Sequence, residues 1–160
     1  MRLRTILTGA VAGWMLTGCT APRQPAIELE PSVRDRILDS ARQEAGNATE
    51  MIAIEIGSHG PDVDAWFIRF CKTSGPSKMA KQVAQYLAKL EGREKTLALF
   101  GPCSRKTAQV AIDALRLCRG KDLTKVTFVF CGEEDDFARI RTIDLGFGGS
   151  LRFVRHPQRE

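Results

Sequence analysis

The chain has 160 residues and a formal net charge of +5, from 24 lysines and arginines against 19 aspartates and glutamates. This length suffices for one domain with its own hydrophobic core. The basic residues form no block with interleaved aromatic residues, which would indicate a nucleic-acid surface. We therefore predict no nucleic-acid partner, because a basic isoelectric point alone concerns solubility and non-specific contacts.

The N-terminus has the pattern of a bacterial export signal. Arg2 and Arg4 precede an apolar run from Ile6 to Leu16, and no further charge occurs before Arg23. A membrane-spanning helix takes roughly 20 mainly apolar residues, and this run is about half that length. We therefore expect a cleaved signal peptide over residues 1–18 and no permanent transmembrane helix.

The signal ends in Leu16-Thr17-Gly18-Cys19, which resembles the lipobox of bacterial lipoproteins. The resemblance implies that Cys19 carries a diacylglycerol and an acylated amino group, and several acyl chains hold a protein stably on a membrane. Thr20 follows the cysteine, which resembles the pattern for sorting to the outer membrane. We expect a domain in the periplasm, anchored by lipid, with other envelope proteins as partners. The alternative is an ordinary secretory signal with a chance cysteine.

The rest of the chain divides into a tether, one domain and a tail. Residues 19–31 contain the anchor and three prolines, which favour an extended tether. Residues 26–29 alternate apolar and polar side chains, so a docking strand is the alternative for this part. Loss of residues 1–18 would lower the net charge to +3, because it removes two arginines and no acid. We expect one periplasmic α/β domain over 32–156 and a tail over 157–160.

The first elements of the domain are predicted from capping and periodicity. Ser32 and Asp35 have the spacing of a capping box, and Gly46 is placed to end the helix that follows. Residues 51–56 and 64–70 have the composition of strands, joined by a loop.

Two similar segments follow, at 75–100 and 101–130. Each begins with Gly-Pro and a serine, continues as an amphipathic helix, and enters an apolar strand after a glycine. Strands separated by single helices indicate right-handed crossovers. Alternating apolar residues on both sides of Gly148-Gly149 predict a final β-hairpin. The predicted fold is therefore α/β, a mixed, largely parallel sheet with helices packed on it, in the order α-β-β-α-β-α-β-β.

Four cysteines remain once Cys19 is assigned to the lipid, and an oxidising periplasm permits an even number to pair. Cys71, Cys103 and Cys131 each follow a predicted strand, so one disulfide among these three is the leading prediction. Cys118 ends a predicted helix on the order of 20 Å from Cys103, too far for a direct bond. We expect Cys118 to be a small buried residue. Two disulfides are the alternative if the strand directions differ.

Candidate binding residues gather at the two Gly-Pro-Ser helix starts. Helix N-termini offer free N–H groups that suit a carboxylate or phosphate, and open α/β sheets bind ligands at the carboxyl edge. The candidate anion-binding residues are Ser77, Lys78, Ser104, Arg105 and Lys106. Ordinary solvated helix starts use the same residue types. The sequence has no nucleotide-binding glycine pattern and no metal-ligand spacing of cysteines and histidines, so we predict neither a cofactor nor a metal.

Catalysis has one candidate nucleophile, Cys103, whose pKa a helix start and nearby Arg105 and Lys106 would lower. His59 is the candidate base. No catalytic signature surrounds these residues, so we predict that the protein is not an enzyme. The favoured function is a non-catalytic docking or assembly component of an envelope machine for secretion, conjugation, pilus formation or polysaccharide export. The alternatives are a periplasmic binding module for a small anion or cell-wall fragment, and a cysteine-dependent enzyme.

Overall fold

The computed structural model describes residues 25–46, 50–142 and 146–156, which form five helices and four strands. The helices are α1 (Pro31–Glu44), α2 (Pro61–Ser74), α3 (Lys78–Ala88), α4 (Ser104–Leu117) and α5 (Glu134–Thr142). The strands are β1 (Met51–Glu55), β2 (Lys95–Phe100), β3 (Val126–Gly132) and β4 (Ser150–Arg155).

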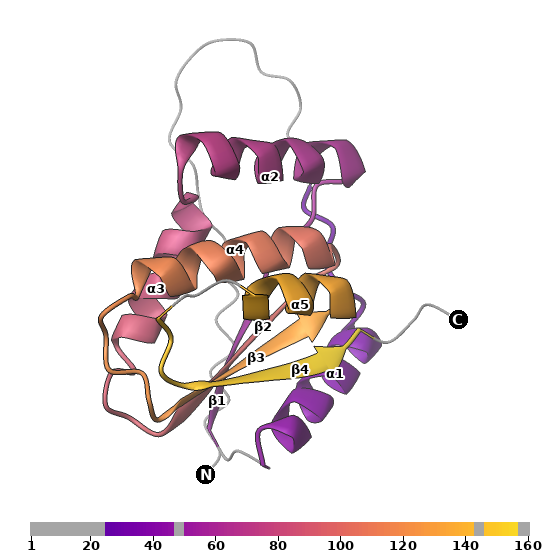
Figure 1. Ribbon diagram of the computed structural model, residues 1–160. Helices are drawn as coiled ribbons and strands as arrows, with labels where there is room; N and C mark the ends of the chain where they lie inside the picture. The colour runs from indigo at the N-terminus through magenta and orange to yellow at the C-terminus, as the bar shows by residue number, and fades with distance from the viewer. Residues whose placement is uncertain (1–24, 47–49, 143–145, 157–160) are drawn as a thin grey trace.

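The four strands form one parallel sheet in the order β1-β2-β3-β4. Ile54 pairs with Leu99 and Leu99 with Phe130, so neighbouring strands are in register through the centre of the sheet. Helices α4 and α5 pack on one face, whereas α1 packs on the other (Figure 1). The predicted α/β class with a largely parallel sheet is confirmed.

A hydrophobic cluster fills each side of the sheet. Successive side chains of a strand point to opposite faces, so Leu99 packs beneath the helices α3 and α4 while Phe100 packs beneath α1. From α1, Ile37 and Ala41 contribute to the second cluster. The predicted apolar faces of α3 and α4 lie in the first cluster, as their helical spacing indicates.

The predicted strand over 64–70 is wrong, because these residues belong to α2. The helix has Pro61 in its first turn together with acidic residues, and both favour a helix start. Its aromatic and branched residues resemble a strand, but Asp64, Phe67 and Cys71 recur at helical spacing on the side that faces the domain. Helix α2 lies over α4, on the side of α4 away from the sheet (Figure 1).

The predicted hairpin across Gly148-Gly149 is also wrong. Helix α5 precedes β4, and β4 pairs with β3 in parallel, so the chain crosses over the sheet and does not turn back. A Cβ at Gly149 would lie 2.3 Å from the carbonyl oxygen of Val126. The glycine therefore permits a close backbone approach. Residues 143–145, part of the predicted hairpin, lie outside the described residues.

The chain enters the domain through residues 25–30. The backbone groups of Ile27 and Ser58 exchange two hydrogen bonds, at 2.6 and 3.1 Å, in an antiparallel bridge. Helix α1 then begins at Pro31, and Ser32 does not cap it. The predicted capping box is wrong because proline, pre-organised for the first helical position, starts the helix two residues earlier than a cap at Ser32 would, with Glu30 at the N-cap position.

Candidate functional site

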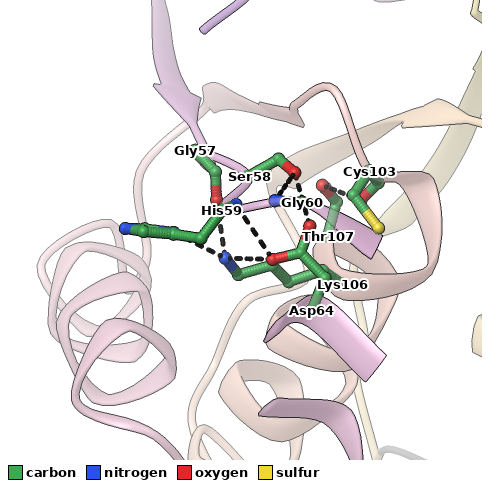
Figure 2. A network of polar contacts seen from close by, with 8 residues as sticks. All are labelled: Gly57, Ser58, His59, Gly60, Asp64, Cys103, Lys106 and Thr107. Carbon is green, nitrogen blue, oxygen red and sulfur yellow. Dashed lines mark hydrogen bonds and ion pairs between the residues drawn. The ribbon is translucent and has the colours of Figure 1, made fainter. Parts of the chain in front are cut away.

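The candidate site lies where β1 and β2 end, beside the starts of α2 and α4. Residues 56–60 follow β1, and residues 101–103 follow β2. Neighbouring parallel strands end at the same edge of a sheet, where ligands bind in open α/β folds. Figure 2 shows the polar residues that meet there: Gly57, Ser58, His59, Gly60, Asp64, Cys103, Lys106 and Thr107.

A buried ion pair between Lys106 and Asp64 forms the centre of this cluster. The Lys106 Nζ lies 2.8 Å from Asp64 Oδ1, and the two side chains are only 4% and 2% exposed. The same Nζ donates to the carbonyl oxygen of Gly57 at 2.7 Å and lies 3.5 Å from Nδ1 of His59. The Phe67 ring centroid is 5.2 Å away. The buried ammonium group is thus fully paired, as a charge removed from water requires.

Asp64 is held in its charged form by several donors. Burial raises the pKa of Asp64, but hydrogen bonds from Lys106, Ser58 and the His59 N–H lower it, and the net pKa lies below the ordinary value. The Ser58 Oγ donates to Asp64 Oδ2 and accepts from the Gly60 N–H at 3.1 Å. One carboxylate therefore connects α2 to the loop after β1 and to α4.

Helix α4 is buried on both sides. Its apolar residues pack toward the sheet, whereas Lys106, Gln109 and Asp113 lie beneath α2 or within the layer of helices. The Gln109 Nε2 donates to both carboxylate oxygens of Asp113 at 3.1 Å. Burial raises the pKa of Asp113, and the Gln109 hydrogen bonds offset only part of this effect. Because α2 covers α4, the polar face of α4 is shielded from solvent over most of its length.

The candidate anion-binding residues at the start of α3 are only partly engaged. Ser77 caps α3, since its Oγ accepts a hydrogen bond from the Ala80 N–H at 3.1 Å. Lys78 is the exposed first residue of the helix. Lys106 belongs to the ion pair with Asp64, so its charge is already neutralised. The structure does not bring these residues together around one empty space.

Acidic residues surround the start of α4. Cys103 occupies the N-cap position, and Ser104 is the first helical residue. The Ser104 Oγ donates to Asp136 Oδ2 at 2.7 Å and accepts from the Glu133 N–H at 2.8 Å. Arg105 is exposed. Because α5 begins here with three acidic residues, the charge around Ser104 disfavours an anion.

The four cysteines within the described residues carry free thiols. Cys71 lies in α2 and not at the end of a strand, and Cys131 lies in β3 with its side chain in the cluster under α1. The predicted alignment of Cys71, Cys103 and Cys131 along one edge is therefore wrong, and a disulfide among them lacks the geometry on which the prediction rests. Cys118 is buried as predicted, and its Sγ donates to the Ala84 carbonyl oxygen at 3.4 Å.

Cys103 does not have the environment of an activated nucleophile. Burial raises the pKa of the Cys103 thiol, and this effect, together with a smaller one from the Asp64 carboxylate, outweighs the lowering by the backbone N–H and the charge of Lys106. The predicted lowering of this pKa is therefore wrong, and a raised pKa disfavours the thiolate that nucleophilic chemistry needs. The His59 side chain and the Cys103 Sγ point in different directions (Figure 2).

Thiol alkylation of the folded protein by iodoacetamide is expected to modify Cys103 first, because it is the only one of the four described cysteines that is not buried. Cys131 should react only after denaturation, since burial raises its pKa to about 12. Peptide mapping by mass spectrometry, with and without guanidinium chloride, measures the order. A pair of cysteines that reacts only after reduction would contradict the free thiols.

A second feature of interest is an apolar ridge on the outer side of α2, formed by Val63, Trp66 and Phe70. These side chains are 48%, 57% and 44% exposed. The Trp66 and Phe70 rings stack with their centroids 5.2 Å apart. Sequence reasoning missed the ridge because it assigned residues 64–70 to a strand. Val63, Trp66 and Phe70 follow one another at intervals of three and then four positions. This helical spacing, directly after Pro61, could have indicated the ridge.

Among the described residues, no group of three or more His, Cys, Asp or Glu side chains is arranged to hold a metal ion. No helix in the same ranges is long and apolar enough to cross a membrane. Comparison with family models, curated proteins and solved structures finds no match to this chain. The structure alone therefore gives the class of this protein: it is an α/β domain with a parallel sheet, in which the outer helix α2 lies over the central helix α4.

Proposed function

We propose that this protein is a lipid-anchored, non-catalytic docking component of the cell envelope and that α2 is its docking element. The observation that carries the proposal is the exposed ridge of Val63, Trp66 and Phe70. Grouped apolar side chains on a surface indicate an interaction site, whereas single ones do not. Burial of apolar surface against a partner contributes about 25 cal/mol per Å², and tryptophan is enriched among the residues that dominate interface energies.

The inner side of α2 supports the same function, because it fixes the ridge in place. Asp64 attaches the start of the helix to Lys106, and Phe67 packs against the hydrophobic cluster. Cys71 is buried near the other end of the helix. A surface that is ordered before binding loses less conformational entropy when a partner docks.

The proposed anchor, Cys19, lies outside the described residues, which begin at Pro25. Pro25 lies six positions after Cys19, and a fully extended chain spans at most about 3.6 Å per residue. The anchor would therefore hold the domain within roughly 20 Å of its lipid. We place the domain on the periplasmic side of the outer membrane, where partners in an envelope machine would meet it.

The two alternative functions receive less support from the geometry. Lys106 is paired with Asp64, and Ser104 faces acidic residues, so an anion finds few free donors at the carboxyl edge. The raised pKa of Cys103 disfavours a thiolate enzyme.

A photocrosslinking amino acid in place of Val63 is expected to form adducts with one or a few envelope proteins in membranes of the native host. The physical reason is that this position borders the exposed Trp66 and Phe70 rings. The adducts should be lost when Trp66 and Phe70 are both replaced by alanine. Gel shifts and mass spectrometry of the adducts make the measurement.

The matched control places the same crosslinker at Gln85, an exposed position of α3. Equal adducts from both positions, or none from position 63, would contradict a docking role for α2. The Cys19→Ser variant tests the anchor separately: it should lose acyl labelling and leave the membrane fraction.

A further inference from the structure

The outer edge of β4 carries backbone groups that no other described strand pairs. The strand ends the sheet and has only β3 as its neighbour (Figure 1). The His156 N–H donates to the Gly132 carbonyl oxygen at 2.9 Å, and alternate residues of a strand bond to the same side, so the even-numbered residues of β4 face β3. Leu151, Phe153 and Arg155 therefore direct their N–H and C=O groups to the free edge. Such an edge is a template for pairing with another strand.

The two ends of this edge carry opposite net charge. Near Leu151, a hollow with a volume of about 470 Å³ is lined by two arginines, Arg141 and Arg152, and by one acid, Glu44. Neither arginine forms an ion pair within the described ranges. At the other end, a hollow of about 310 Å³ is lined by three acids and one arginine: Glu133, Glu134, Asp135 and Arg155. The first end is thus net positive and the second net negative.

We propose that two copies of this chain pair through β4, antiparallel, around a two-fold axis at Phe153. The four strands of each copy then continue into one sheet. In this register Leu151 lies opposite Arg155 of the second copy, and Phe153 lies opposite Phe153, so all three outward-facing residues exchange backbone hydrogen bonds. This inference goes beyond the proposed docking function and does not depend on it.

The same symmetry brings opposite charges together across the axis. Glu134 and Arg141 are seven positions apart, about two turns, so they lie on the same side of α5. Glu134 pairs with Arg155 at one end of the edge, and Arg141 lies beside Leu151 at the other. A two-fold axis through the middle of β4 therefore places Arg141 of each copy beside Glu134 of the other. An interface of this symmetry requires such a self-complementary surface, and complementary charges fix its register.

The edge arginines favour this register over its neighbours. In it, Arg152 lies opposite Val154 and Arg155 lies opposite Leu151, so no arginine directly faces another. A shift that centres the pairing on Arg152 would place the two copies of this residue opposite each other, and like charges in that position are unfavourable. An extended segment of another protein can also add to a sheet edge. It would have to supply an acid and a base at the matching ends, whereas the second copy already has both.

The pairing leaves the docking ridge free on both copies. A two-fold axis perpendicular to the sheet keeps each face of the sheet on its own side, so both α2 helices lie on the same face of the dimer. Helix α2 lies outside α4 and away from β4 (Figure 1). Two ridges on one face would bind a repeated partner more tightly than one ridge does.

The test uses the full chain in membranes of the native host, with a photocrosslinking amino acid in place of Arg152. We expect an adduct of twice the chain mass, with the crosslink mapped by mass spectrometry to the peptide that contains Val154. Arg155→Pro is expected to lower the yield at least tenfold, because proline removes an N–H that points to the free edge and leaves the bonds to β3 intact. Arg155→Ala, the matched control, removes the same side chain, keeps the N–H and should retain the adduct.

The charges are tested by a swap within one chain. Arg141→Glu should lower the yield of the double-mass adduct about tenfold, because the new acid would face Glu134 of the second copy. Adding Glu134→Arg should restore it, because only a partner that carries both changes can recover the pairing. Thermal melts by circular dichroism should show that these variants and Arg155→Pro remain folded.

Each other outcome overturns the proposal in its own way. Equal yields in Arg155→Pro and Arg155→Ala would mean that the copies meet elsewhere than at the edge of β4. Adducts with another protein alone would replace the second copy with an extended segment of that protein, and no adduct from position 152 would mean that the edge is only solvated. The crosslinker at Val63 reads the ridge on α2 separately, so failure here leaves the docking function standing.

Discussion

Replacing Lys106 with methionine is expected to lower the free energy of unfolding by about 3–5 kcal/mol, because it leaves the charge of Asp64 buried without its partner. Asp64 is 2% exposed, and the variant also removes the donor to the Gly57 carbonyl oxygen. Urea denaturation of the purified protein, followed by circular dichroism, measures the loss.

The double variant Lys106→Met, Asp64→Leu is the control for charge. Because it leaves no unpaired charge, it should recover much of the stability lost in the single variant. Lys121→Met is the control for exposure, since it breaks the exposed pair with Glu91 and should cost less than about 1 kcal/mol. A Lys106→Met variant no less stable than Lys121→Met would show that the pair is not buried.

The pH dependence of stability checks the same pair independently. The pKa of Asp64 is lowered in the folded protein from an ordinary 3.8, since its hydrogen bonds outweigh its burial. A lowered carboxyl pKa contributes stability that is present above the unfolded value and is lost as the pH falls through the folded value. The unmodified protein should therefore lose stability in acid more steeply than Asp64→Asn.

Local patterns were sufficient to predict the strands β1, β2 and β3 and the helices α3 and α4 that connect them. The apolar runs at 95–100 and 126–131 form β2 and β3. The side-chain oxygen of Ser77 caps α3, as serine commonly does before the first turn of a helix. These features depend on residues close in sequence, which explains why the parallel α/β class could be inferred before the structure.

The candidate site could not be predicted because it depends on contacts between distant segments. Lys106 and Asp64 are 42 residues apart, and no local pattern links them. Their pairing also requires α2, whose run of aromatic and branched residues favours a strand by propensity. Once α2 was assigned to a strand, Lys106 was expected to lie at an open helix start. Tertiary packing on α4 overrides the local preference and buries the lysine.

The glycines at the carboxyl edge also have roles that only the structure shows. In the sequence, Gly101 is the first residue of a Gly-Pro helix start, which is ordinary for a loop. In the fold it follows β2 where the chain passes the end of β1, and the Ile56 N–H donates to the Phe100 carbonyl oxygen at 2.7 Å. The strands are thus still joined at the point where the loops of the site begin.

The Gly101→Ala variant is consequently expected to destabilise the protein by about 3 kcal/mol, the upper part of the range for overpacking. An added Cβ would lie 2.2 Å from the Ile56 carbonyl oxygen, a backbone atom that cannot rotate away, and 3.0 Å from Thr107 Oγ1. Relief requires the loop after β1 to move, and that loop carries the Gly57 carbonyl oxygen bound by Lys106. The variant should therefore lower the urea midpoint and also speed alkylation of Cys103.

Gly92→Ala is the matched control, because Gly92 has a positive φ of 69° but nothing within 4 Å of an added Cβ. It should cost about 1–2 kcal/mol from backbone strain alone and leave the alkylation rate of Cys103 unchanged. A Gly101→Ala variant that loses stability but not Cys103 protection would mean that the clash relaxes away from the site. A variant as stable as the unmodified protein would contradict the close approach of the two strand ends, on which the geometry of the ion pair depends.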